Sequence, residues 1–322
     1  MKIIFMGTPQ FAVVCLKKLR DSGLHITAVV TTPDKPVGRG LKLLPSPVKI
    51  EALDSDIPVL QPENLKEPAF LSRINEIKPD LMIIVAFRIL PEVLFSKAKH
   101  GAVNLHGSLL PKYRGAAPIN WAIINGEAQT GLTTFFLKQR VDTGNIICQE
   151  KIEISPDMTA GELHDIMAEK GAELLLQTIR LIESDNVKIS TQEETEVTRA
   201  PKIFPQDCLI NFNQPVKKVH DFIRGLSPKP GAYTYYKNKR IQLFKSTLSD
   251  IKARENEPGS FVESGNYKAL LIQCNPGTLK IVEIKLEGKR QMPVEDFLRG
   301  HKLTPDSIFS SSSFCAPARK NL

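Results

Sequence analysis

The strongest constraint on the fold is the alternation of short apolar runs with amphipathic stretches along the first half of the chain. The apolar runs cover residues 3–6, 26–31, 81–86, 102–105 and 132–137. Amphipathic stretches that predict helices lie at residues 10–21, 46–54, 68–76, 91–96, 118–125 and 160–184. The run 81–86 is apolar without alternation, as in a central strand covered on both faces. This pattern predicts an α/β fold with a doubly wound, mostly parallel, Rossmann-like sheet.

The chain changes character from Asp207 onward. One expected helix, at residues 215–225, is followed by short β-type runs at 232–236, 241–245, 269–274 and 279–286. Short strands of even spacing are typical of a small β-barrel, here of the OB-like kind. We therefore expect a first domain at residues 1–189, a linker at 190–206, a β-barrel domain at 207–309 and a disordered tail at 310–322.

Positive charge is concentrated in the second half of the chain. Residues 1–189 carry 22 basic and 21 acidic side chains, a net charge of +1, whereas residues 190–322 carry 21 and 14, a net charge of +7. This asymmetry favours a polyanionic partner, and a solvated basic surface is the alternative. The candidate phosphate contacts are Lys217, Lys237, Lys239 and Arg240 in the second domain, and Lys35, Arg39 and Lys42 in a Pro- and Gly-rich loop of the first.

Several cofactors and locations are disfavoured. The five cysteines are scattered without C-x-x-C spacing, which predicts reduced thiols and neither disulfides nor a metal site. The turn Gly7-Thr8-Pro9 does not match G-x-G-x-x-G, so no nicotinamide cofactor is expected. No apolar run reaches 18 residues and no targeting segment is recognisable, so we expect a cytoplasmic protein without membrane spans.

The chemistry is expected at residues 104–115, directly after an apolar run. The period of two along a strand places Asn104 and His106 on one face at the strand's end, where open α/β sheets bind ligands. An imidazole can transfer a proton near neutral pH, and a carboxamide can donate a hydrogen bond to an oxyanion. Neither is a strong nucleophile, and the chain has no G-x-S-x-G elbow. Direct transfer is therefore favoured over a covalent intermediate.

Asp142 is expected to complete this group. It begins Asp142-Thr143-Gly144, an ordinary turn sequence that also occurs in aspartic proteases. A protease would need two such carboxylates, whereas this chain has one copy, within an α/β pattern. Beside Asn104 and His106, a carboxylate would orient the imidazole and raise its basicity.

Four segments resemble the methionyl-tRNA formyltransferase family in order and spacing, and the resemblance spans the chain except its tail. These segments are residues 5–9, 33–47, 104–118 and 142–144. The pattern Asn-x-His-x-Ser-Leu-Leu-Pro is shared by the wider group of enzymes that use 10-formyltetrahydrofolate, so it indicates the chemistry and not the acceptor. Residues 113–118 and 223–232 resemble the methionyl-tRNA formyltransferase family more narrowly than they resemble this wider group. The stretch 87–91 departs from the family, which commonly has a Tyr-Gly pair there.

The resemblance implies transfer of the formyl group of 10-formyltetrahydrofolate to the α-amine of methionyl initiator tRNA, with Asn104, His106 and Asp142 as catalytic residues. It implies a tRNA-binding barrel and a monomeric enzyme. The implied folate contacts at the strand ends are Phe87, Ile89, Leu90, Ser108, Leu109, Leu110 and Pro111. Three alternatives stay open: a formyltransferase for an amino sugar or other small amine, a non-catalytic RNA-binding module, and a folate hydrolase.

Overall fold

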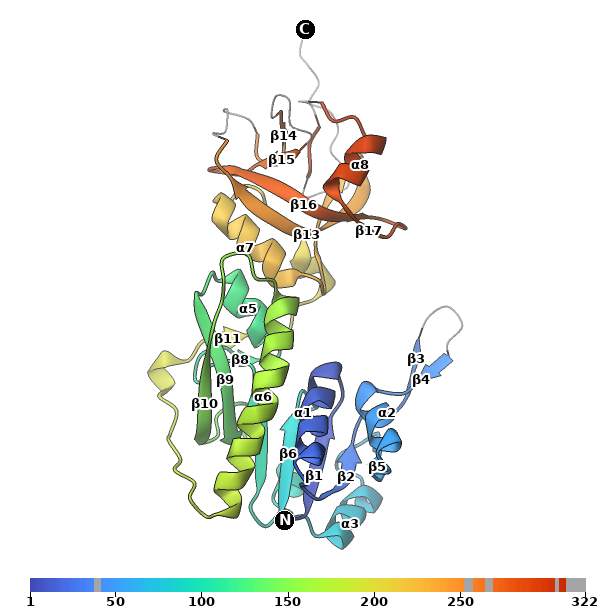
Figure 1. Ribbon diagram of the computed structural model, residues 1–322, viewed down its shortest axis with the longest axis vertical. Helices are drawn as coiled ribbons and strands as arrows, with labels where there is room; N and C mark the ends of the chain where they lie inside the picture. Colours follow the sequence, from blue (N-terminus) through green and yellow to red (C-terminus); the bar gives the residue numbers. More distant parts are fainter. Residues whose placement is uncertain (38–41, 252–256, 264–268, 305–306, 311–322) are drawn as a thin grey trace. The chain divides into compact units, whose positions relative to one another are not determined.

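The computed structural model describes residues 1–37, 42–251, 257–263, 269–304 and 307–310 (Figure 1). The chain forms two compact units, each built from several segments. The first comprises Met1–Pro118, Gln129–Glu153 and His164–Pro201. The second comprises Ile119–Ala128, Ile154–Leu163 and Lys202–Leu322. The domain limits expected from the sequence stay predictions, and the expected tail lies outside the described residues from position 311 onward.

The first unit is built on a seven-stranded sheet with the order β10-β9-β7-β6-β1-β2-β5. The strands are β1 (Ile3–Gly7), β2 (Ile26–Val30), β5 (Val59–Leu60), β6 (Leu81–Val85), β7 (Ala102–His106), β9 (Gln129–Phe136) and β10 (Ile146–Glu153). The neighbouring strands from β7 to β5 pair in parallel. The pairings of β7 with β9 and of β9 with β10 are antiparallel. The expected doubly wound, mostly parallel sheet is confirmed. The edge strand β10 was not predicted, because its half-exposed residues lack a continuous apolar run.

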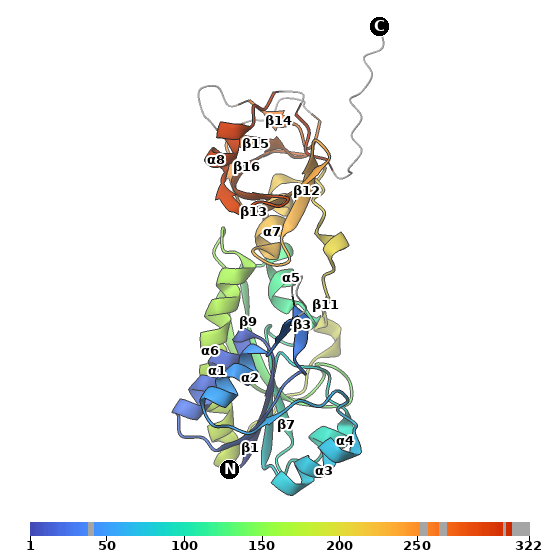
Figure 2. The same cartoon turned by 90° about the vertical axis from the view of Figure 1, so that its right-hand side faces the viewer.

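Helices cover both faces of this sheet (Figure 2). Ile4, Met6, Met82 and Ile84 pack in one buried cluster with residues of the helices α3 (Pro68–Ile77) and α4 (Glu92–Phe95). On the other face, a Cβ added at Gly171 of α6 (Ala160–Glu183) would lie 2.7 Å from Leu105 of β7, so helix and strand are in close contact. The other α-helices among the described residues are α1 (Gln10–Asp21), α2 (Pro47–Asp54), α5 (Pro118–Ile124), α7 (Val216–Leu226) and α8 (Val294–Gly300).

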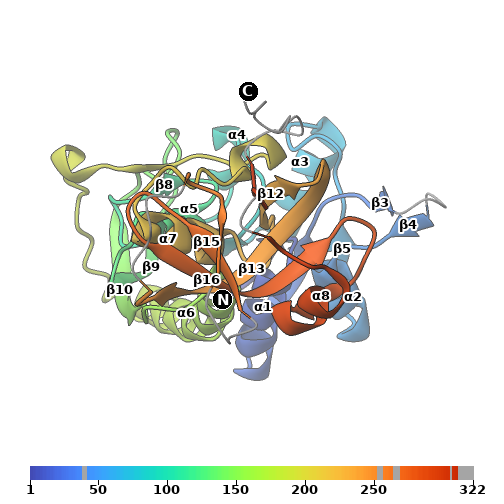
Figure 3. The same ribbon diagram turned by 90° about the horizontal axis from the view of Figure 1, so that it is seen from above.

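The second unit contains an antiparallel sheet that curls into a barrel (Figure 3). Its strands, in the order β12-β13-β16-β15-β14, are β12 (Ala232–Tyr236), β13 (Lys239–Ser249), β16 (Thr278–Leu286), β15 (Leu270–Gln273) and β14 (Phe261–Val262), and β17 (Gln291–Pro293) also pairs with β16. Ser310 pairs with Tyr235 and Ile308 pairs with Ser260, so residues 308–310 bridge the two edges of the sheet. The expected small β-barrel after the α/β sheet is thereby confirmed.

Two short strand pairs lie in the first unit, apart from the large sheet. They are β3 (Lys35–Val37) with β4 (Lys42–Leu44), and β8 (Arg114–Gly115) with β11 (Arg199–Ala200). A capping box precedes α6, because Thr159 Oγ1 accepts from the Glu162 amide and the Glu162 carboxylate accepts from the Thr159 amide.

A buried histidine on α7 makes the stability of the second unit dependent on pH. His220 is 3% exposed. Its Nδ1 lies 3.0 Å from Ser246 Oγ and its Nε2 lies 3.2 Å from the Pro156 carbonyl oxygen. Burial lowers the pKa of His220. The hydrogen bond with the Pro156 carbonyl and the Asp157 carboxylate, 3.3 Å from Nε2, oppose this effect only in part. The charges of Asp221 and Arg224 also act on the ring, with opposite signs.

We predict that the substitution His220→Gln makes the free energy of unfolding depend less on pH in the acidic range. Because the folded pKa lies below the unfolded value of about 6.5, the unfolded chain binds more protons between the two values. Stability is therefore lost as the pH falls below that value, with a slope of at most about 1.4 kcal/mol per pH unit. Urea unfolding between pH 7 and pH 5 measures this slope. The exposed residue His25 supplies the control, since His25→Gln should retain it. Equal slopes in all three proteins would contradict the prediction.

Candidate active site

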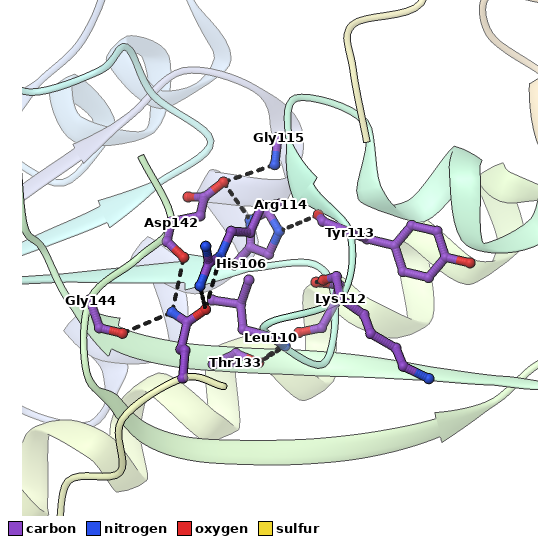
Figure 4. A network of polar contacts seen from close by, with 11 residues as sticks. His106, Leu110, Lys112, Tyr113, Arg114, Gly115, Thr133, Asp142 and Gly144 are labelled. Carbon is purple, nitrogen blue, oxygen red and sulfur yellow. Dashed lines mark hydrogen bonds and ion pairs between the residues drawn. The ribbon is translucent and has the colours of Figure 1, made fainter. Parts of the chain in front are cut away.

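His106 ends β7 and is 6% exposed. Its Nε2 lies 2.9 Å from the carbonyl oxygen of Tyr113, in the loop that follows the strand (Figure 4). A carbonyl can only accept a hydrogen bond, so Nε2 is the protonated nitrogen of the neutral ring. The other nitrogen, Nδ1, then carries no proton and can accept one.

Asp142 faces that second nitrogen. It lies in the loop between β9 and β10 and is 9% exposed. Its Oδ2 accepts a hydrogen bond of 2.9 Å from the Gly115 amide and lies 3.9 Å from His106 Nδ1. The second distance is longer than a hydrogen bond, so the two groups form an ion pair only when Nδ1 is protonated. The structure therefore brings His106 and Asp142 together, as the sequence predicted.

Asn104 precedes His106 by two residues on β7 and is partly exposed. The alternation of a strand places both side chains on the same face. Ala102, on that face as well, belongs to the cluster under α3 and α4. Asn104 and His106 thus lie at the carboxyl end of β7, where open α/β sheets bind ligands.

The loop after β7 is fixed by one hydroxyl group. Thr133 Oγ1 on β9 donates to the Ser108 carbonyl oxygen at 2.7 Å and accepts from the Leu110 amide at 3.1 Å. The Ser108 hydroxyl donates to the Lys112 carbonyl oxygen, and Ser108 is fully buried. Ser108 and Leu110, both expected to contact folate, therefore also stabilise the loop itself. Pro111 is buried too, whereas Leu109 is partly exposed.

A cavity of about 510 Å³ opens at the ends of β5 and β6. Such a volume is ordinary for a site that binds a small molecule. Leu65 and Leu90 are buried in it, whereas Ile89 is 74% exposed. Gln139 also lines the cavity, from the same loop that carries Asp142. Of the residues expected to contact folate, Ile89 and Leu90 line this cavity.

Arg88 stiffens the wall of the cavity. Its guanidinium group donates to the carbonyl oxygens of Pro62 and Glu63, each at 2.9 Å, and lies 5.1 Å from the centre of the Phe87 ring. Burial lowers the pKa of Arg88. Phe87 was expected to contact folate, and the structure places it against this guanidinium group.

The residues expected to contact tRNA differ in their surroundings. Lys35, Lys237 and Lys239 are exposed. Arg240 is partly buried, with its guanidinium carbon 4.0 Å from the centre of the Tyr233 ring. Lys217 pairs with Asp221 at 2.8 Å, which neutralises part of its charge. Arg39 and the side chain of Lys42 lie outside the described residues.

Sequence reasoning missed two residues that join the loops around the site. Arg114 donates to the side chain of Gln192 and forms an ion pair with Glu194 at 2.9 Å. The hydrogen bond from Arg114 lowers the pKa of Glu194. Gln192 in turn contacts the loop of Asp142. A glutamine in a polar stretch gives no signal of burial, so only the folded chain reveals this role.

Within the described ranges, no group of three or more His, Cys, Asp or Glu side chains is arranged to hold a metal ion. A search of the same residues also finds no helix long and apolar enough to cross a membrane.

We predict that Gly144→Ala disrupts the loop that carries Asp142. A Cβ at this position would lie 1.5 Å from the Phe136 carbonyl oxygen, a main-chain atom that cannot rotate away. We expect the variant to lose at least about 1–3 kcal/mol of stability through overpacking, together with its activity. Thermal unfolding measures the loss. Gly300→Ala is the control, because its Cβ would meet nothing within 4 Å. A melting temperature equal to that of the control would show that the loop can rearrange.

Family models match both parts of the chain. The model described as formyl transferase matches residues 1–179, and the formyl transferase C-terminal domain matches residues 202–302. The chain is 44% identical to the methionyl-tRNA formyltransferase of Bacteroides fragilis, with coverage of 94% of this chain and 96% of the relative. It is 43% identical to that of Acetivibrio thermocellus, with coverage of 94% and 97%.

Solved structures share the fold at lower identity. The crystal structure of WlaRD, a sugar 3N-formyl transferase, is 22% identical with a TM-score of 0.64, and the match covers 90% of this chain and 99% of that one. HypX from Aquifex aeolicus is 18% identical with a TM-score of 0.65, over 95% of this chain and 49% of that one. The two family matches and the relatives at 43–44% identity lead to one conclusion: the chain belongs to the formyl transferase family.

Proposed function

We propose that this formyl transferase transfers the formyl group of 10-formyltetrahydrofolate to the α-amino group of methionyl initiator tRNA, giving N-formylmethionyl-tRNA for translation initiation. The observation that carries the proposal is the His106–Asp142 pair at the end of β7, in a chain 44% identical to a methionyl-tRNA formyltransferase over nearly its whole length. The amine nitrogen is proposed to attack the formyl carbon. The bond between that carbon and N10 of the folate then breaks, and N10 of the departing tetrahydrofolate receives the proton that the amine lost.

His106 and Asp142 are proposed to manage the proton that the amine loses. With Nε2 held by the Tyr113 carbonyl, only Nδ1 can accept this proton, and the Asp142 carboxylate lies on that side. Asn104, on the same face of β7, is proposed to donate a hydrogen bond to the oxyanion of the tetrahedral intermediate. The chain's own groups would thus supply a proton acceptor, a carboxylate that stabilises the protonated form of that acceptor, and a hydrogen-bond donor to the oxyanion.

The cavity at the ends of β5 and β6 is the proposed folate site. The exposed Ile89 and the buried Leu65 and Leu90 all line it, and an apolar lining of this kind suits a flat heterocycle. The loop of Gln139 and Asp142 then connects this cavity with the reacting groups. Two proteins that share the fold have structures with folates, namely WlaRD with 5-N-formyl-THF and HypX with tetrahydrofolic acid. Phe87, Ser108, Leu109, Leu110 and Pro111 stay proposed contacts.

The basic side chains of the second unit are proposed to bind the phosphate backbone of tRNA. Lys237 and Lys239 are exposed on the turn between β12 and β13, and Arg240 stacks on Tyr233. In the first unit, Lys35, Arg39 and Lys42 are the proposed contacts. Because phosphate contacts release counterions, affinity for tRNA should fall steeply with salt.

A formyltransferase for an amino sugar is the second candidate. The match with the sugar 3N-formyl transferase WlaRD covers nearly all of both chains, so the fold alone does not select the acceptor. The experiment is single-turnover transfer from 10-formyltetrahydrofolate, with methionyl initiator tRNA and a nucleotide-linked amino sugar offered in separate reactions. We expect formylated methionyl-tRNA only. Transfer to the sugar alone would overturn the proposed acceptor, and release of formate without transfer would favour a hydrolase.

We predict that alanine at Asn104, His106 or Asp142 lowers kcat roughly 100- to 1,000-fold. Each substitution removes an oxyanion donor or part of the proton-accepting pair. Single-turnover rates with methionyl-tRNA measure the loss. The exposed residues His25 and Asp54 provide matched controls, since His25→Ala and Asp54→Ala should keep the wild-type rate. Activity above a tenth of wild type in any of the three variants would remove that residue from the catalytic group.

We predict that Ile89→Ala weakens folate binding roughly tenfold, because a side chain that the ligand would bury is truncated. Calorimetric titration with tetrahydrofolate measures the affinity, and the KM for methionyl-tRNA should not change. Ile50→Ala serves as the control, since Ile50 is 48% exposed on α2 and does not line the cavity. Unaltered affinity in Ile89→Ala would exclude this cavity edge as the folate site.

A further inference from the structure

Residues 190–200, here called the strap, run across the loops that hold the proposed catalytic pair. Ser190 pairs with Ile146 at the start of β10. Thr198 accepts from the Tyr113 amide through its hydroxyl, and its carbonyl accepts from the Arg114 amide. The strap thus contacts both the loop after β7 and the start of the strand after Asp142.

The close packing of the strap depends on a glycine. At Gly115, where φ is +131°, an added Cβ would lie 2.4 Å from the Ala200 carbonyl oxygen. The same residue supplies the amide that donates to Asp142. The strap therefore packs directly on the backbone that holds the carboxylate.

The Gln192 side chain lies at the centre of these contacts. It is 6% exposed. Its Nε2 donates to the carbonyl oxygens of Asp142, at 2.9 Å, and Gly144, at 2.8 Å. Its Oε1 accepts from Nε and Nη2 of Arg114, at 3.0 and 2.7 Å. Both donors and both lone pairs of the carboxamide are used, and the partners allow only one orientation of the amide.

This arrangement stabilises an uncommon backbone conformation. Asp142 has a φ of +55°, in the left-handed region that costs a residue with a Cβ on the order of 1 kcal/mol. Two hydrogen bonds from one side chain to the carbonyls of Asp142 and Gly144 hold the loop in this shape. With that backbone fixed, the carboxylate is directed at the Gly115 amide and at His106 Nδ1.

We infer that Gln192 is a positioning residue for formyl transfer, one that holds Asp142 against His106 from the strap. It acts through Asp142, and this role rests on the proposed function of the His106–Asp142 pair. Loss of its donors lets the loop of Asp142 relax. A displacement of about 1 Å at a reacting group can lower a rate about a hundredfold.

The test compares Gln192→Ala with Gln192→Glu, which keeps an acceptor for Arg114 but loses the amide donors. Both should lower kcat roughly 10- to 100-fold, with the KM values for 10-formyltetrahydrofolate and methionyl-tRNA changed less than threefold. The exposed neighbour gives the control Thr191→Ala, which should behave as wild type. Unchanged kcat in Gln192→Glu, or raised KM with constant kcat, would overturn the inference.

A double-mutant cycle shows whether Gln192 acts through Asp142. In the Asp142→Ala background, Gln192→Ala should cause no further loss of rate, because the group that it positions is already absent. If the rate of the double variant falls by the product of the two single-variant factors, Gln192 has a general structural role instead.

A readout without substrates separates this inference from the proposed function. Hydrogen exchange of peptides that cover residues 113–116 and 140–145 should accelerate in Gln192→Ala and remain unchanged in Thr191→Ala. Unchanged exchange in Gln192→Ala would overturn the positioning role even if the wild-type protein formylates tRNA. No transfer by the wild-type protein, together with accelerated exchange, would instead overturn the proposed function and leave the contact in place.

Discussion

The arrangement of the candidate site depends on one hydrogen bond between two loops that are far apart in sequence. The Gly115 amide donates to the Asp142 carboxylate at 2.9 Å and so joins the loop after β7 to the loop after β9. The same carboxylate lies 3.9 Å from His106, whose other nitrogen is held by Tyr113. A carboxylate fixed by a backbone amide cannot rotate freely, so the orientation of the imidazole and that of its partner are set together.

The sheet makes this meeting of loops possible. Four parallel pairings end their strands on one side of the first unit, where the cavity at residues 63–66 and 88–92 also opens. The antiparallel strand β9 then places Thr133 beside His106, so its hydroxyl can fix the intervening loop. The loop that carries Gln139 and Asp142 borders this cavity and also holds the carboxylate that faces His106. The proposed folate site and the proposed catalytic pair therefore share one stretch of backbone.

The second unit combines a buried polar network with a basic exterior. Arg224 donates to Asp221 and to the Met158 carbonyl, and both charged side chains are nearly fully buried. A buried ion pair of this kind adds little net stability, because desolvation offsets the attraction. Its contribution is geometric, because Asp221 orients the Arg224 guanidinium group, whose hydrogen bond to the Met158 carbonyl joins the segment before α6 to α7 within this unit. The exposed lysines around Tyr233 and Arg240 remain available for a polyanion.

The sequence alone determined much of the local structure and which residue types stand where the chemistry is expected. The apolar run at 81–86 and the alternation that places Asn104 with His106 are consequences of short-range periodicity, which the chain expresses wherever it folds. Tertiary structure decided the geometry between His106 and Asp142, the antiparallel edge at β10 and the contacts of Gln192. These depend on contacts between residues 36 to 78 positions apart or on strand direction, and neither has a local periodic signal. Gln192, in a polar stretch typical of a linker, can be buried because its side chain makes four hydrogen bonds to three residues.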